Sequence, residues 1–206
     1  MVKTPETHSQ STENKILEAA KKVFILHGLE GTSMQQIADE AGINKSLLHY
    51  YFRTKEKLFD AVFTYAFHYI VPQMEGILSS ESCINDKIER IVAEYMDLLS
   101  ENKFIPAFIL HEINRNPDRL YNIMQKSGIK PEMFINHFVK EIQQGNIRPI
   151  DPRQLIINIL AMCIFPVAAR PLIQRIFFGN NESAYRQFLE ERKKIVSEFI
   201  IQSIKP

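Results

Sequence analysis

The chain has 206 residues, 45% hydrophobic and 24% charged, which is typical of a folded globular protein and excludes a disordered chain. The formal net charge of +1 excludes a polycation that coats nucleic acid without specificity, so any DNA binding must depend on a local cluster of charge. Its two cysteines, Cys83 and Cys163, lack partners at metal-ligand spacing, so we expect reduced thiols, no metal site and no cofactor.

The N-terminal segment is polar and lacks the apolar run of a signal peptide, so we expect residues 1–11 to form a disordered tail of a cytoplasmic protein. Beyond it, apolar residues recur with helical spacing and no alternating strand pattern appears, which predicts an all-α fold. Thr12 is a suitable N-cap for a first helix that ends near His27, just before Gly28.

Two short helices are predicted next. Thr32 or Ser33 caps the first of them, and Gly42 breaks the chain after it. Asn44 caps the second, which ends near Phe52. Two short helices joined by a tight glycine turn are the arrangement of a helix-turn-helix, whose second helix fits the major groove of DNA.

The rest of the chain predicts further helices, whose N-termini are often marked by proline. Pro72 should kink or end the first of these helices. The apolar stretch 155–169 has about 15 residues against the ~20 needed to span a bilayer, so we expect a helix buried on several sides and no membrane span. The predicted helices cover residues 55–78, 84–101, 105–115, 117–127, 131–144, 152–178 and 182–204.

The predicted helix before Phe52 has two unlike faces. One face is polar and basic and carries Lys45, Ser46, His49, Tyr50 and Arg53. The other is apolar and carries Leu47, Leu48, Tyr51 and Phe52. Between residues 45 and 57, four basic side chains oppose the single anion Glu56, which gives a local net charge of +3. This pattern suits phosphate binding, although by itself it equally describes a solvated surface helix that happens to be basic.

Several short sequence elements follow one another between residues 24 and 58. They are Phe24, Gly28, Gly31-Thr32-Ser33, Ile37-Ala38, Ala41-Gly42-Ile43, Tyr50-Tyr51-Phe52 and Thr54-Lys55-Glu56-Lys57-Leu58. With these elements the segment closely resembles the DNA-binding domain of the TetR family of bacterial transcriptional regulators. The resemblance implies a three-helix helix-turn-helix domain over residues 12–58, with a connecting helix from 55 to about 78. It also implies a helical ligand-binding and dimerisation domain over residues 59–206.

The resemblance also implies which residues contact DNA. Lys45, Ser46, His49 and Tyr50 are expected to face the groove. Thr32 or Ser33 would offer a hydroxyl or N–H group to a phosphate, and Tyr51 and Lys55 match phosphate-contacting positions, although the helical wheel places Tyr51 inward. Many relatives carry Gly, Thr and Tyr where this chain has Ser46, Leu47 and His49, so no known operator sequence can be transferred to it.

A ligand pocket is expected among the middle helices, where aromatic residues are dense, although each aromatic taken singly fits a plain core better than a pocket lining. The candidate lining residues are Phe104, Phe108, His111, Phe134, Phe138 and Phe165. Such a lining suits a lipophilic or aromatic effector better than a sugar or a metal. The last two predicted helices have more apolar surface than a monomer of this size buries easily, which favours a homodimer through them.

Together these expectations predict a repressor that binds a palindromic DNA operator as a dimer and is released from it by an unknown small-molecule effector. An enzyme is the first alternative, but no catalytic triad, phosphate loop or metal-ligand spacing supports it. A protein-interaction module that has the helix-turn-helix without reading DNA is the second alternative, and the basic cluster argues against it.

Overall fold

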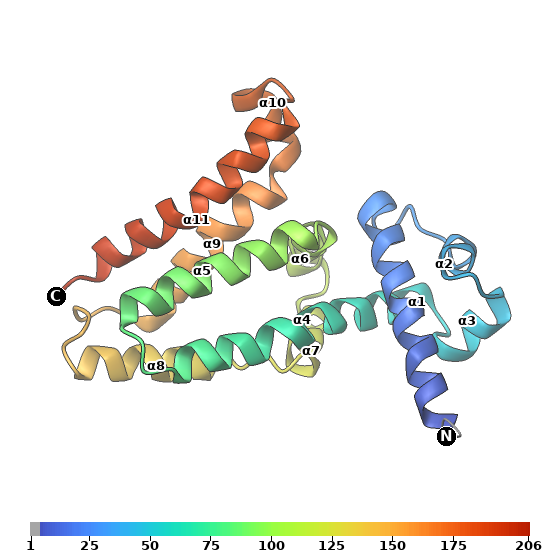
Figure 1. Cartoon of the computed structure of the whole chain (residues 1–206), viewed down its shortest axis with the longest axis horizontal. Coiled ribbons are helices and arrows are strands. Elements are labelled where there is room, and N and C mark those ends of the chain that lie inside the picture. The colour runs from blue at the N-terminus through green and yellow to red at the C-terminus, as the bar shows by residue number, and fades with distance from the viewer. Residues whose placement is uncertain (1–4) are drawn as a thin grey trace. The chain divides into compact units, whose positions relative to one another are not determined.

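A computed structural model describes residues 5–206, with side chains for all of these except 5–10, Ala66, Tyr69, Phe104, Ala107, Phe108 and His111. Over residues 5–206 the chain forms eleven α helices and no strand, which confirms the all-α prediction (Figure 1). The helices are α1 (Pro5–His27), α2 (Met34–Ala41), α3 (Lys45–Tyr51), α4 (Lys55–Ser79), α5 (Ile84–Glu101), α6 (Phe104–Arg115), α7 (Pro117–Lys126), α8 (Pro131–Gln143), α9 (Pro152–Ala168), α10 (Arg170–Phe178) and α11 (Glu182–Ile204).

The chain forms two compact units that are not simply consecutive in sequence. The first unit runs to His68 and also includes Ala107–Ser127, which adds most of α6 and all of α7 to the helix-turn-helix. The second unit contains Tyr69–Pro106 and Gly128–Pro206. The boundary expected near Leu58 therefore differs from the observed division, because α4 continues past it and a later segment returns to the first unit.

In the first unit, α1 packs on α2 and α2 packs on α3. Ile16, Ala20 and Phe24 on one stripe of α1 are fully buried, as their helical spacing predicts. The ring of Phe24 meets that of Phe59 on α4 edge to face, with 4.9 Å between centroids. This core fixes α2 and α3 against the start of α4.

In the second unit, α11 lies along α5 and α9, and α9 also packs against α8 (Figure 1). Buried residues one helical turn apart line the contacts between these helices. They include Ile88, Val92 and Met96 on α5, Leu155, Ile159 and Cys163 on α9, and Val196, Ile200 and Ile204 on α11.

Two predicted helix boundaries are wrong, and one proline expected to kink or end a helix does not end it. The first helix begins at Pro5 and not at Thr12, so residues 5–11 are helical where a tail was expected; a proline at the first helical position lacks only an N–H that has no partner inside the helix. Pro72 does not end α4, which continues to Ser79. The stretch 152–178 divides at Ala169, where Pro171 cannot donate to the preceding turn.

The apolar stretch 155–169 is buried on one side only, which corrects the expectation of a helix buried on several sides. Leu155 and Ile159 are buried, whereas Ile157 and Phe165 are 58% and 63% exposed. Among the described helices, none alone has the length and apolarity needed to span a membrane; α9 and α10 reach them only as a pair, bent by 73°.

Candidate nucleic-acid interface

Hydrogen bonds at both ends fix the position of α2. Ser33 is its N-cap and forms a capping box with Gln36, in which the Ser33 hydroxyl accepts from the Gln36 N–H and the Gln36 side chain accepts from the Ser33 N–H at 2.8 Å. At the other end Gly42 takes the left-handed conformation with φ of 61°, and its N–H donates to the carbonyls of Ala38 and Asp39. This glycine makes the tight turn into α3.

A second cap begins α3. The side-chain oxygen of Asn44 accepts a hydrogen bond from the Leu47 N–H at 2.7 Å. Leu48 is fully buried and Phe52 is 8% exposed, so the inner face of α3 packs on the core of the first unit. Packing of this face leaves the opposite, polar face of α3 in solvent.

The predicted groove-facing side chains all lie on the exposed side of α3. Lys45, Ser46, His49 and Tyr50 are exposed, and Tyr50 is the most prominent, with 81% of its surface accessible. A large aromatic side chain gains nothing from this exposure in the free protein, so the position suits contact with a partner. Sequence reasoning assigned Leu47 to the buried face, but it is 36% exposed beside Ser46.

The predicted phosphate-contacting residues divide into two groups. Thr32 is 4% exposed, its hydroxyl donates to the Gly28 carbonyl at 2.6 Å and its N–H donates to the Leu29 carbonyl, so this residue has a structural role. Ser33 is exposed, and Tyr51 is half-buried against the edge of the Tyr50 ring. The helical wheel predicted a buried Tyr51, and the family resemblance predicted a Tyr51 exposed to phosphate. Its partial burial is intermediate between these two predictions.

The start of α4 adds positive charge next to α3. Lys55 is half-buried and its Nζ donates to the Glu30 carbonyl at 3.5 Å, while Arg53 and Lys57 are exposed. The only carboxylate among residues 45–57 is Glu56, whose pKa is lowered chiefly by a hydrogen bond to its own backbone and further by Thr54 and Lys55. Glu56 is therefore an anion held at the helix N-terminus.

The helix-turn-helix formed by α2 and α3 lies in a segment that matches a known protein family. Residues 16–62 match the family of bacterial regulatory proteins called the tetR family, and this match spans α1 to the first part of α4. Residues 16–62 are thus similar to the DNA-binding domain of the tetR family. The relatives that the chain matches are named HTH-type transcriptional regulators and not enzymes. Together with the tetR-type domain, this makes the chain a DNA-binding transcriptional regulator.

Relatives that match nearly the whole chain are transcriptional regulators as well. The chain is 24% identical to the HTH-type transcriptional regulator YfiR of Bacillus subtilis, over 98% of this chain and 97% of that protein. It is 26% identical to the HTH-type transcriptional regulator RutR of Escherichia coli K12, over 97% and 96% of the two chains. The fold also resembles the transcriptional regulator FadR of B. subtilis in complex with stearoyl-CoA, with a TM-score of 0.71 and 17% identity over 91% of this chain and 96% of that one.

Of the six residues expected to line a ligand pocket, three have side chains that the structure describes. Phe138 is 1% exposed in the core of α8, and Phe134 is half-buried. Phe165 is 63% exposed on α9, so the expectation that it lines an internal pocket is wrong. The side chains of the other three, Phe104, Phe108 and His111, lie outside the described ones. Within the described side chains, no three His, Cys, Asp or Glu residues are grouped to hold a metal ion.

Proposed function

We propose that the protein is a repressor that binds a palindromic operator as a homodimer through α3. The observation that carries this proposal is the exposed face of α3 with Lys45, Ser46, His49 and Tyr50, supported by the basic residues at the start of α4. Lysine, hydroxyl and imidazole groups donate to base edges and phosphates, and the partly exposed Leu47 suits contact with a thymine methyl group.

The homodimer is proposed to form through α9, α10 and α11, where a single chain exposes many apolar side chains. On α9 Ile157 and Leu160 lie about one turn apart, and on α11 Ile195 and Phe199 do the same. Arg192 on α11 donates to the Met162 carbonyl of α9 at 3.1 Å, which ties these two helices together. An apolar surface on neighbouring helices favours association of two copies. Its members are Ile157, Leu160, Phe165, Leu172, Ile176, Phe177, Ile195 and Phe199.

We further infer that a lipophilic or aromatic small molecule releases the protein from DNA. The supporting observations are the density of aromatic residues between 104 and 138 and the likeness in fold to a FadR that binds stearoyl-CoA. Asp60 on α4 offers a route for the signal: it accepts from Nη2 of Arg119 on α7 at 2.6 Å, and Nη1 of Arg119 lies 3.5 Å from the buried Glu112 on α6. Movement of α6 and α7 would be transmitted to α4 through these ion pairs.

Hydroxyl-radical footprinting of the DNA upstream of the protein's own gene tests the repressor proposal. We expect two protected half-sites of opposite orientation, separated by about one helical turn or a multiple of it. Lys45→Ala and Tyr50→Ala should remove the protection. Lys126→Ala and Tyr121→Ala, which remove an exposed lysine and an exposed tyrosine of α7, should leave the protection intact.

A single unrepeated footprint, or protection that persists in Lys45→Ala and Tyr50→Ala, would contradict binding of a palindrome through α3. The effector is sought by adding fatty acyl and aromatic compounds to the complex. Loss of the footprint with one of these compounds is the expected result, and a footprint that persists with all of them would contradict a lipophilic or aromatic effector.

A further inference from the structure

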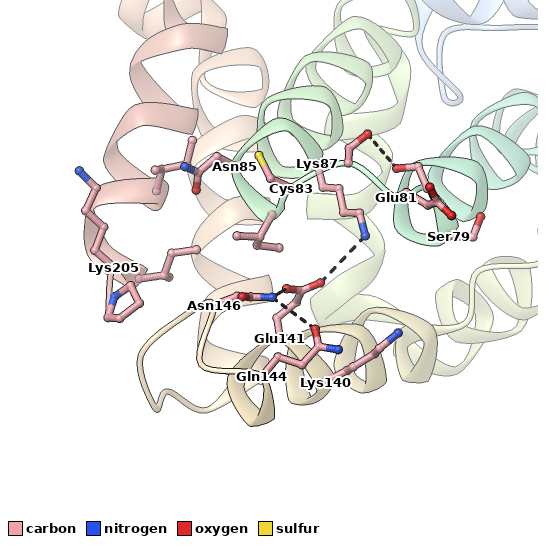
Figure 2. Close-up of a pocket in the computed structure, with 16 residues that line it drawn as sticks. Ser79, Glu81, Cys83, Asn85, Lys87, Lys140, Glu141, Gln144, Asn146 and Lys205 are labelled. Atoms are coloured by element: carbon pink, nitrogen blue, oxygen red, sulfur yellow. Dashed lines mark hydrogen bonds and ion pairs between the residues drawn. The ribbon is translucent and has the colours of Figure 1, made fainter.

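The second unit contains a polar cavity of about 560 Å³ that the DNA-binding function does not use. It lies where the turn between α4 and α5 faces the end of α8 and the last turn of α11 (Figure 2). Three segments line it, residues 79–87, 140–146 and 201–206. None of the aromatic residues expected to bind the effector is among them. The volume lies in the range of small-molecule sites, about 300–1,000 Å³.

Two buried charges of opposite sign face each other in this cavity. The Lys87 residue is 5% exposed and the Glu141 residue 7% exposed, and Nζ of the lysine lies 4.0 Å from Oε1 of the glutamate (Figure 2). This separation is too long for a hydrogen bond. The side-chain N–H of Asn146 donates to the other oxygen, Oε2 of Glu141, at 2.7 Å.

Both charged groups have hydrogen-bonding capacity left over. The ammonium of Lys87 has three N–H donors, and among the described residues it makes one hydrogen bond, to the Leu78 carbonyl at 3.1 Å. Oε1 of Glu141 accepts none from the described residues; its neighbour Nε2 of His137 is 3.5 Å away and makes no hydrogen bond there. Burial, and then the charge of Lys87, lower the pKa of His137, so its ring is neutral at neutral pH.

A buried ion pair at this distance is a poor source of stability, because desolvation costs more than a pair without a direct hydrogen bond recovers. Two opposite charges held apart in a cavity instead suit a zwitterionic ligand, which carries one positive and one negative group. An anion alone would be repelled by Glu141 and a cation alone by Lys87, and a neutral sugar would add no charge to offset the weak pairing between the two side chains. An α-amino acid carries a carboxylate and an ammonium group on a single carbon atom, which matches the pair.

We propose that this cavity binds a free α-amino acid, with its carboxylate on Lys87 and its ammonium group on Glu141. The surrounding residues suit a polar side chain. Asn85, Gln144 and Asn146 contribute amides, and Ser80 and Ser82 contribute hydroxyl groups that are 3.2 Å apart. These groups donate or accept hydrogen bonds without adding charge. Binding takes place within the second unit and does not depend on DNA.

The reactivity of Cys83 can report whether the cavity is occupied. Cys83 lines the cavity and is exposed, whereas Cys163 is buried in the α9 core, where burial raises the pKa of its thiol to about 12. The thiolate is the reactive form, so a thiol reagent should label Cys83 alone in the folded chain. An amino acid in the cavity should hinder that reaction.

The test measures the labelling rate of Cys83 with Ellman's reagent in the full chain, with each proteinogenic L-amino acid except cysteine, whose thiol consumes the reagent, added singly at millimolar concentration. We expect at least one to slow labelling, by about tenfold at a concentration about tenfold above Kd, and to raise Tm by about 3 °C. Its N-acetyl and carboxamide forms, which lack one of the two charges, should do neither.

Two variants make the result specific to the cavity. Cys83→Trp fills the mouth of the cavity at an exposed position whose side chain makes no capping hydrogen bond, and it should abolish the rise in Tm. Lys87→Met removes the buried ammonium and should do the same, while Lys126→Met, at an exposed lysine of α7, should not. The proposal is overturned if no amino acid changes either reading, or if the rise in Tm persists in Cys83→Trp.

Discussion

The exposed side chains of α3 and the start of α4 differ in reach and chemistry, which divides DNA binding between them. His49 and Ser46 are short and lie near the middle and the start of α3, so we assign them to base edges. Lys55 begins α4 and carries a compact point charge on a long side chain, which suits a phosphate. Residues of the first kind determine which sequence is bound, and residues of the second kind determine how strongly salt weakens binding.

This division predicts different outcomes for His49→Ala and Lys55→Ala. Lys55→Ala should weaken binding to all duplexes alike and reduce the slope of log K against log salt by about 1. His49→Ala should keep that slope and reduce the preference of the protein for its operator over altered sequences, at a cost of about 1–3 kcal/mol at one base pair. Binding to a set of operators with single base changes, measured at several salt concentrations, separates the two effects; a reduced slope in His49→Ala would contradict the assignment.

At the scale of elements, the direction of α3 depends on the turn before it. Gly42 has a φ of 61°, and a Cβ built on it would meet only Nζ of Lys15, at 3.8 Å, which is ordinary contact. The cost of a side chain there is therefore one of backbone conformation. Gly76 in α4 is the opposite case, because its conformation is helical and nothing lies within 4 Å of an added Cβ.

The two glycines therefore predict changes of opposite sign in the free energy of unfolding. Gly42→Ala should destabilise the protein by about 1 kcal/mol, because alanine is strained in the left-handed region. Gly76→Ala should stabilise it by up to about 1 kcal/mol, because alanine favours a helix. Urea unfolding followed by circular dichroism measures both. Equal effects of the two substitutions would mean that the left-handed turn does not constrain α3.

The sequence predicted the helix-turn-helix closely, since local signals determine it: Ser33, Gly42 and Asn44 act as caps where their residue types favour caps. Sequence-based prediction missed the features that depend on contacts between segments far apart in the chain. The cavity depends on Lys87 and Glu141, which are separated by more than fifty residues. The sequence does contain one indication that Lys87 is unusual. It lies on the same stripe of α5 as the buried Ile84 and Ile91, where a charged residue is unexpected. Nothing local, however, indicates that Glu141 would face it.

At the scale of the whole molecule, the proposed dimer combines two copies of α3 into one reading surface. A single recognition helix contacts few base pairs, so affinity and specificity both depend on the second copy. The apolar surface on α9, α10 and α11 is therefore as important to DNA binding as the residues of α3, although its proposed role is to hold the dimer together and not to contact DNA.

A charge placed in that surface tests this dependence. Phe199→Asp replaces a side chain that is 59% exposed, so it should leave the fold of the single chain intact while raising the dissociation constant of the dimer at least about tenfold. Operator affinity should fall with it. Tyr121→Asp, at a residue of α7 that is 62% exposed, is the matched control. Sedimentation equilibrium measures the association, and a Phe199→Asp chain as dimeric as the control would contradict the proposed interface.

Recognition of a particular DNA sequence by α3 is tested most directly by fluorescence anisotropy on two duplexes. One duplex carries the footprinted upstream sequence, and the other carries the same bases in scrambled order. We predict that the upstream duplex binds at least about a thousandfold more tightly. Tyr50→Ala should remove most of this preference, while Tyr121→Ala should leave it unchanged. Equal affinity of the unaltered protein for both duplexes would contradict sequence recognition by α3.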